Sequence, residues 1–173
     1  MQLHLVRHTS VNVPKGMCYG HSEVPLASSY TKEKSIVLKL IENISFEKVY
    51  SSPLSRCLKL ATCISSSVLT DSRLIEMNFG EWELKNWSDI KDDYADQWMN
   101  DYLNLACPGG ESFNDLLTRL KFFLGDINKI NKNSIIITHS GIIRCAYHLI
   151  QNIDINKLFD LKVDFGSIHS FEL

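Results

Sequence analysis

Two short apolar segments that each run directly into a histidine constrain the fold of this chain more than any other feature. Residues 3–6 predict a buried strand, and Arg7 and His8 follow it without a break. Residues 134–138 predict a second buried strand, and His139 comes next. Open α/β sheets bind their ligands in the crevice beyond the carboxyl ends of the strands. We therefore expect both histidines and the arginine to meet in one crevice.

The remaining apolar patterns alternate between strands and helices along the chain. Further strands are expected over residues 46–50, 68–74 and 167–173, and helices are expected to begin near residues 31, 53, 113 and 140. This alternation predicts an α/β fold, a three-layer αβα sandwich with a mostly parallel sheet. A chain of 173 residues is long enough for one domain, residues 1–173, in which residues 84–108 form a short helical lid insertion.

A third cation is expected at the start of the helix near residue 53. Ser52 is a favourable N-cap and Pro53 a favourable first helical residue. Arg56 then lies about one turn into the helix, and its guanidinium can reach the positive N-terminal end, where anions bind. An arginine that faces solvent on a surface helix is the plainer alternative. Residues 9–30 predict a long loop over the tip of the first strand.

Charge and composition exclude several classes of protein. The net charge of −2 disfavours a nucleic-acid binder, which would carry a basic excess. No apolar run approaches the ~20 residues of a membrane span, and the chain begins without the pattern of a signal peptide. The five cysteines are scattered and lack the spacing of zinc ligands. These features predict a cytoplasmic protein with free thiols.

The expected cluster of Arg7, His8, Arg56 and His139 has the chemistry of a phosphate site. Arginine forks pair with phosphate oxygens, and a histidine held among cations stays neutral and can attack phosphorus. The second histidine can donate a hydrogen bond to a phosphoryl oxygen. Glu76 is the candidate acid for the departing oxygen, because partial burial would favour its protonated form. This scheme requires no metal and no cofactor.

Five motifs make the chain resemble the histidine phosphatase superfamily, in its phosphoglycerate mutase-like branch, over essentially its whole length. They are residues 5–9 (LVRHT), 49–56 (VYSSPLSR), Glu76 with 79–83 (FGEWE), 108–112 (PGGES) and 138–144 (THSGIIR). The resemblance implies the phosphoglycerate mutase-like fold. It also implies that His8 is the phosphorylated nucleophile, that Glu76 is the proton donor, and that Arg7, Arg56 and His139 hold the phosphate, with His139 also taking part in catalysis.

Four positions depart from the pattern of the superfamily. Thr9 and Leu84 stand where glycine is usual, Ser10 replaces a glutamate, and Pro14 replaces the asparagine typical of mutases. These departures leave the phosphohistidine chemistry intact and count against mutase activity. A phosphoglycerate mutase-type phosphomutase nevertheless stays open as an alternative, and so does a phosphate-binding module without turnover.

A second, more local resemblance concerns the substrate. Residues 16–20 (GMCYG) and 24–26 (VPL) are similar to the small bacterial α-ribazole phosphatases, which dephosphorylate a nucleotide-like intermediate of cobalamin biosynthesis. This resemblance implies a small-molecule phosphomonoester as the partner. The sequence leaves open the oligomeric state and any role of Cys18 and His21 near the site.

The composition of the lid predicts the same kind of substrate. Counted over residues 81–107, the segment expected to fold over the site, the carboxylates are Glu81, Glu83, Asp89, Asp92, Asp93, Asp96 and Asp101, against the cations Lys85 and Lys91. If these carboxylates face the site, they disfavour a substrate with further anionic groups. Trp87 and Trp98 would cover a flat and partly apolar leaving group.

Overall fold

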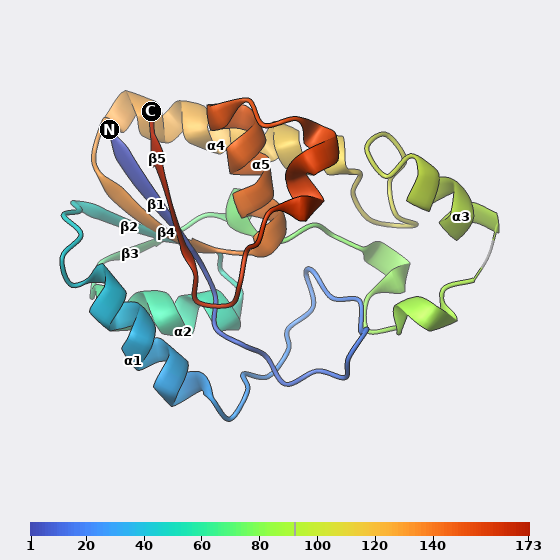
Figure 1. Ribbon diagram of the computed structural model, residues 1–173, viewed down its shortest axis with the longest axis horizontal. Coiled ribbons are helices and arrows are strands. Elements are labelled where there is room, and N and C mark those ends of the chain that lie inside the picture. The colour runs from blue at the N-terminus through green and yellow to red at the C-terminus, as the bar shows by residue number, and fades with distance from the viewer. Residues whose placement is uncertain (92) are drawn as a thin grey trace.

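A five-stranded sheet lies between two layers of helices in the computed structural model, which describes residues 1–91 and 93–173 (Figure 1). The strands are β1 (Gln2–Arg7), β2 (Lys48–Ser51), β3 (Val68–Thr70), β4 (Ser134–Thr138) and β5 (Ile168–Glu172). Their order across the sheet is β3-β2-β4-β1-β5. β5 is an antiparallel edge strand, and the other pairings are parallel. The αβα sandwich with a mostly parallel sheet is therefore confirmed.

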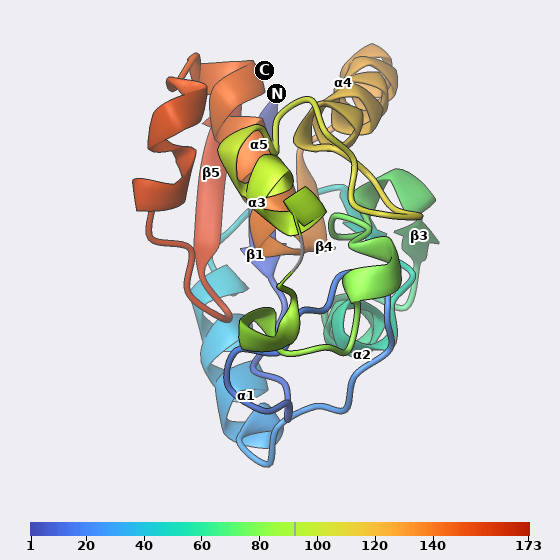
Figure 2. The same cartoon turned by 90° about the vertical axis from the view of Figure 1, so that its right-hand side faces the viewer.

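Two helices cover each face of this sheet, as Figure 2 shows. They are α1 (Tyr30–Ile41) and α2 (Ser55–Ile64) on one face, and α4 (Phe113–Ile130) and α5 (Ser140–Gln151) on the other. Successive side chains of a strand point to opposite faces of the sheet, so one strand contributes to the hydrophobic core on each face. In β1, Leu3 and Leu5 face α4 and α5, while Val6 faces α1 and α2. Short 3-10 turns occupy Ser72–Leu74, Gly80–Trp82, Trp87–Asp89 and Ile155–Asp160.

The register of the two central strands sets the position of the histidines. β1 pairs with β4 so that Arg7 lies opposite Thr138. The backbone N–H of His8 then donates to the Thr138 carbonyl at 3.0 Å. His8 and His139 are the residues that directly follow this pair, so both leave the sheet at the same edge.

Two sequence-based expectations, on where a helix begins and where a strand ends, need correction. α2 begins at Ser55 with Leu54 as its N-cap residue, later than Ser52 and Pro53 predict. The Ser52 hydroxyl lies 2.9 Å from Nε2 of His139 and accepts a longer hydrogen bond from the backbone N–H of Leu54 at 3.4 Å, which lies before the first residue of α2. The predicted strand over residues 68–74 ends at Thr70, because Asp71 caps the 3-10 turn that follows.

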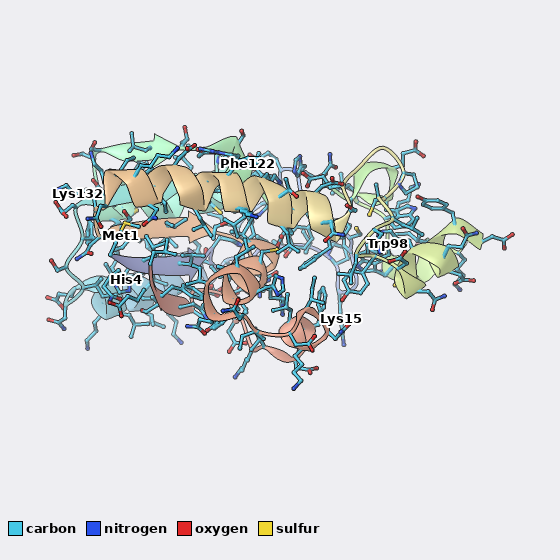
Figure 3. All side chains as sticks on the ribbon, turned by 90° about the horizontal axis from the view of Figure 1, so that it is seen from above. Met1, His4, Lys15, Trp98, Phe122 and Lys132 are labelled. Atoms are coloured by element: carbon cyan, nitrogen blue, oxygen red, sulfur yellow. The ribbon has the colours of Figure 1, made fainter. Side chains whose placement is uncertain are left out.

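Residues 84–108 are predicted to form a helical lid insertion, and α3 (Asp93–Asn100) is the α-helix that the structure places within this range. Figure 3 places Trp98 at the end of the molecule opposite Met1 and Lys132. The rings of Trp87 and Trp98 stack with centroids 5.9 Å apart, and Trp82 meets Trp98 edge-on at 5.2 Å. This aromatic cluster joins residues 84–108 to the body of the protein.

The state of the cysteines bears on the expectation of free thiols. All five cysteines are free, and four of them are buried. Burial raises the pKa of the Cys18 thiol to about 12, so Cys18 is a packing residue and not a reactive thiol.

Among the helices that the structure describes, none combines the length and apolar character that crossing a membrane requires.

Candidate active site

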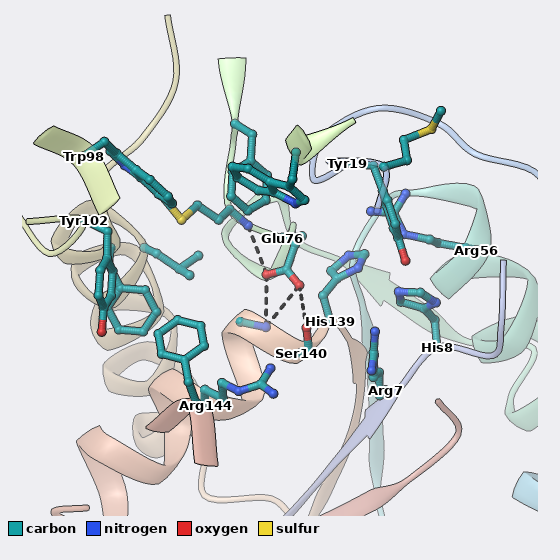
Figure 4. A pocket seen from close by; sticks show the side chains of 18 of the residues that line it. Arg7, His8, Tyr19, Arg56, Glu76, Trp98, Tyr102, His139, Ser140 and Arg144 are labelled. Atoms are coloured by element: carbon teal, nitrogen blue, oxygen red, sulfur yellow. Dashed lines mark hydrogen bonds between the residues drawn. The ribbon is translucent and has the colours of Figure 1, made fainter. Parts of the chain in front are cut away.

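A cavity of about 530 Å³ opens at the carboxyl ends of β1 and β4. Arg7, His8, Arg56, Glu76 and His139 all line it, and Figure 4 shows them from close by. The residues predicted from separate parts of the chain are therefore brought together in one place.

His8 lies directly after β1 and is buried. Its Nδ1 is 2.8 Å from the carbonyl oxygen of Thr9. A carbonyl only accepts, so Nδ1 carries the proton and Nε2 keeps its lone pair. Burial, together with the nearby charges of Arg56 and Arg7, lowers the pKa of His8 to about 3. At neutral pH the ring is an uncharged base with Nε2 available for attack on an electrophile.

His139 is the N-cap residue of α5 and is fully buried. Its ring meets that of His8 edge-on, with centroids 5.1 Å apart. Burial, the His8 ring and the Arg56 charge hold its pKa well below the ordinary range. The Ser52 hydroxyl lies 2.9 Å from its Nε2 and fixes the orientation of the ring. The Sγ atom of Cys57 packs against the same ring at 3.5 Å from Nε2.

Arg7 is held by the loop that precedes β5. Its Nη1 donates to the carbonyl of Val163 at 2.6 Å, and its guanidinium carbon lies 3.8 Å from the centre of the Phe165 ring. Its Nε is buried without a partner among the described residues. A buried donor without an acceptor costs about 1–3 kcal/mol, so an anion whose oxygen reaches this nitrogen would be favoured.

Arg56 has no solvent exposure, which excludes the alternative of a solvent-facing arginine. Its Nη2 and Nη1 donate to the carbonyls of Gly20 at 2.6 Å and Ser22 at 2.9 Å, and its Nε has no partner in the described part of the chain. The loop reaches Arg56 only with glycine at position 20, because a Cβ there would lie 1.8 Å from the Met77 carbonyl oxygen.

Glu76 lies across the cavity at the N-terminus of α5. Its carboxylate accepts from the backbone N–H of Gly141 at 3.0 Å and of Met77 at 3.1 Å, and from the Ser140 hydroxyl at 3.2 Å (Figure 4). Arg119 donates to the backbone carbonyl of Glu76 at 2.8 Å. These contacts fix the carboxylate so that it faces the cavity that holds His8.

The half of the cavity beyond Glu76 is aromatic and apolar. Its lining includes Phe79, Trp87, Trp98, Met99, Tyr102, Phe113 and Phe159. The expectation of an acidic lid over the site is wrong for the described carboxylates, since none of those between residues 81 and 107 lines the cavity. Glu83 binds the backbone N–H groups of His21 and Ser22 instead. Asp92 lies outside the described residues.

Several residues of the site have no predicted role. Tyr19 lines the cavity beside Arg7 and Arg56, and its only sequence signal is its place in the GMCYG segment. Phe165 lies over Arg7, and no pattern in the sequence marks it. Arg144 also lines the cavity. His21 is absent from the lining, so its ring takes no part in the described cavity.

No group of three or more potential metal ligands occurs among the described residues.

The fold and this combination of side chains define a class of phosphatase. The sequence model of the histidine phosphatase superfamily (branch 1) matches residues 3–173. The chain therefore belongs to the histidine phosphatase superfamily, and the predicted resemblance is confirmed.

Individual relatives within this superfamily carry different names. The chain is 25% identical to the adenosylcobalamin/alpha-ribazole phosphatase of Escherichia coli K12, over 96% of the chain and 87% of the relative. It is 26% identical, with the same coverage, to the putative phosphoserine phosphatase 2 of Hydrogenobacter thermophilus. The crystal structure of a putative alpha-ribazole-5'-P phosphatase from E. coli superposes with a TM-score of 0.89 at 24% identity, over 98% of this chain and 89% of the other. This last comparison shows the shared fold.

Proposed function

We propose that this protein is a metal-independent phosphomonoester hydrolase that works through a phosphohistidine on His8. The observation that carries the proposal is the state of His8. Its Nδ1–H is bound to the Thr9 carbonyl, its Nε2 is unprotonated, and two guanidinium groups lie beside it. A neutral imidazole among fixed cations is suited to attack a phosphorus atom that those cations bind.

The first step joins Nε2 of His8 to phosphorus and breaks the bond to the leaving oxygen. Arg7 and Arg56 hold the phosphoryl oxygens, and His139 donates to one of them as their charge rises. Glu76 gives its proton to the leaving oxygen. In the second step the Glu76 carboxylate takes a proton from water, whose oxygen attacks phosphorus and releases His8 and inorganic phosphate.

The aromatic half of the cavity supports a flat and partly apolar leaving group. Among the named relatives, the α-ribazole phosphatases act on a group of this shape, so α-ribazole 5'-phosphate is the first substrate to test and cobalamin biosynthesis the first pathway. In this proposal residues 1–173 form one catalytic domain, residues 84–108 are its lid, and the free thiols accord with a cytoplasmic location.

Two measurements test the reaction. Rapid acid quench of the enzyme with ³²P-labelled substrate should trap acid-labile phosphate on the wild type and none on His8→Ala, which should also release no phosphate. Wild-type rates in His8→Ala would exclude the mechanism. Phosphate release should exceed transfer to a glycerate acceptor, whereas dominant transfer would identify a phosphomutase, and binding without either would identify a phosphate-binding module.

Glu76 is tested with two leaving groups. Glu76→Gln should lower the rate by ~10²–10⁴ for an alkyl phosphate, whose leaving oxygen needs a proton. The loss should be far smaller for 4-nitrophenyl phosphate, whose leaving group is a stable anion. Equal losses with both substrates would assign Glu76 a purely structural role.

A further inference from the structure

One cation in the cavity has no part in the proposed reaction. Arg144, on α5, lines the cavity on the side of Tyr102 and Phe159, away from His8. In Figure 4, Arg144 lies below Ser140 and Glu76, on the side of the cavity away from His8 and Arg56. Arginine is costly to place in an apolar cavity, so its position calls for a physical reason.

The guanidinium of Arg144 is fixed on one side only. Its Nε donates to the carbonyl of Leu158 at 3.0 Å and its Nη2 to that of Leu161 at 3.3 Å. It also lies over the Phe159 ring, 5.5 Å from the centre. These contacts orient the group, while Nη1 makes no hydrogen bond to any residue in the part of the chain that the structure describes. The result is a positioned guanidinium with one unbonded nitrogen on a residue that lines the cavity.

The charges that line the cavity do not balance around Arg144. Among the described residues, the lining holds three guanidinium groups, those of Arg7, Arg56 and Arg144, and one carboxylate, that of Glu76. A phosphomonoester dianion matches Arg7 and Arg56. When Glu76 carries the proton for the leaving group, Arg144 has no negative partner in the described lining. Burial lowers the pKa of Arg144, which agrees with a guanidinium that has given up part of its hydration.

We propose that Arg144 determines specificity by donating a hydrogen bond from Nη1 to an oxygen or nitrogen acceptor on the leaving group of the substrate. The substrate class is then a phosphomonoester whose leaving group combines an apolar ring with an acceptor at its far side. This inference rests on the proposed function and names a feature of the substrate at the same site. The acceptor is either neutral, as in a nucleoside-like group, or a carboxylate.

A matched series of aryl phosphates tests the inference on the protein as it is. Phenyl phosphates that carry an ethyl, a carbamoyl or a carboxylate group, each at the meta and the para position, differ mainly in the acceptor that they offer. The variants are Arg144→Met, which removes the donor, and Arg144→Gln, which keeps polar contacts without the charge. Lys157→Met is the matched control, because Lys157 is an exposed cation on the neighbouring 3-10 turn.

The readout is the ratio of kcat/KM between acceptor and ethyl substrates, compared between wild type and variant. The intrinsic reactivity of each leaving group cancels in this comparison. A charge-assisted hydrogen bond predicts that Arg144→Met and Arg144→Gln lower the ratio by about 10-fold or more, that Lys157→Met leaves it unchanged, and that ethylphenyl phosphate turnover persists.

Each outcome has a distinct meaning. If Arg144→Met lowers the kcat/KM ratio for both the carbamoyl and the carboxylate substrates, the result supports a neutral acceptor. If it lowers the ratio for the carboxylate substrates alone, the result supports an anionic leaving group. Ratios that Arg144→Met leaves unchanged at both ring positions, or equal losses for all three groups, would overturn the role of Arg144 while the phosphatase proposal stands. Failure of the wild type to release phosphate from any aryl phosphate would instead overturn the proposed function.

Discussion

The contact between Gly141 and Glu76 allows a sharp test of the proposed proton donor without changing Glu76 itself. A Cβ at position 141 would lie 2.2 Å from Oε1 of Glu76. Ordinary contact begins at 3.4 Å, so Gly141→Ala must push the carboxylate away by about 1 Å. The backbone N–H of Gly141, which donates to both carboxylate oxygens, would lose this alignment as well.

The size of the effect follows from the function of the carboxylate. A misplacement of about 1 Å in a catalytic group costs roughly 10²-fold in rate. We therefore expect Gly141→Ala to lower kcat/KM for an alkyl phosphate by about 10²-fold, and to leave 4-nitrophenyl phosphate within a few fold of the wild type. Glu76→Gln is expected to show the same difference between the two substrates, so Gly141→Ala tests the role of Glu76 through a substitution at another residue.

The assay compares steady-state phosphate release for the two substrates. Gly125→Ala is the matched control, because Gly125 is also helical and a Cβ there meets nothing within 4 Å. This control should gain up to about 1 kcal/mol in free energy of unfolding and keep both activities. Full activity of Gly141→Ala toward the alkyl phosphate would refute the assignment of Glu76 as proton donor. A loss of 4-nitrophenyl phosphate turnover of the same size would refute it too.

Four further predictions concern pH, phosphate binding, backbone strain and metals. The pKa of His8 is lowered from 6.5 to about 3, so the unfolded chain takes up the proton first and stability falls as the pH drops below 6.5. His139, whose pKa is also lowered, destabilises the protein over the same range, so the His8 contribution is the difference between wild type and His8→Asn. Urea titrations should show that the free energy of unfolding falls by about 2 kcal/mol more in the wild type than in His8→Asn between pH 6.5 and 5, and equal losses in the two proteins would contradict this cause. Arg56→Lys keeps the positive charge but removes the paired N–H donors of the guanidinium, so it should raise the Ki of inorganic phosphate about 10-fold or more. An unchanged Ki would mean that phosphate binds elsewhere. Leu84 has φ +63° and is exposed, so Leu84→Gly should remove about 1–2 kcal/mol of strain, partly offset by the entropy of glycine, and a lower melting temperature would count against this strain. Chelators should leave phosphate release unchanged, whereas a loss restored by zinc or magnesium would contradict the metal-independent scheme.

Much of this site was predictable from local patterns. The apolar runs of β1 and β4 identify two buried strands, and the residue that follows each run must leave the sheet at its edge, so His8 and His139 were predicted beside one another. Outside the site, the capping box of Ser112 and Asp115 at the start of α4 is a local feature of the same kind, and both of its hydrogen bonds are present. The end of each strand and the capping box depend on residues two to four positions apart, where the sequence itself sets the geometry.

Other features depend on residues far apart in the chain, and only tertiary packing decided them. Ser52 has the sequence of an N-cap, yet its hydroxyl pairs with His139, 87 residues away. The predicted lid, residues 84–108, has the composition of an acidic cover, yet its aromatic side chains line the cavity and its described carboxylates do not. Burying aromatic rings removes apolar surface from water, whereas burying a carboxylate costs its hydration. The carboxylate of Glu76 is held by Gly141, 65 residues away. The sequence by itself determined which chemical groups leave the sheet together, and the packing of distant segments decided which of them share hydrogen bonds and which meet solvent.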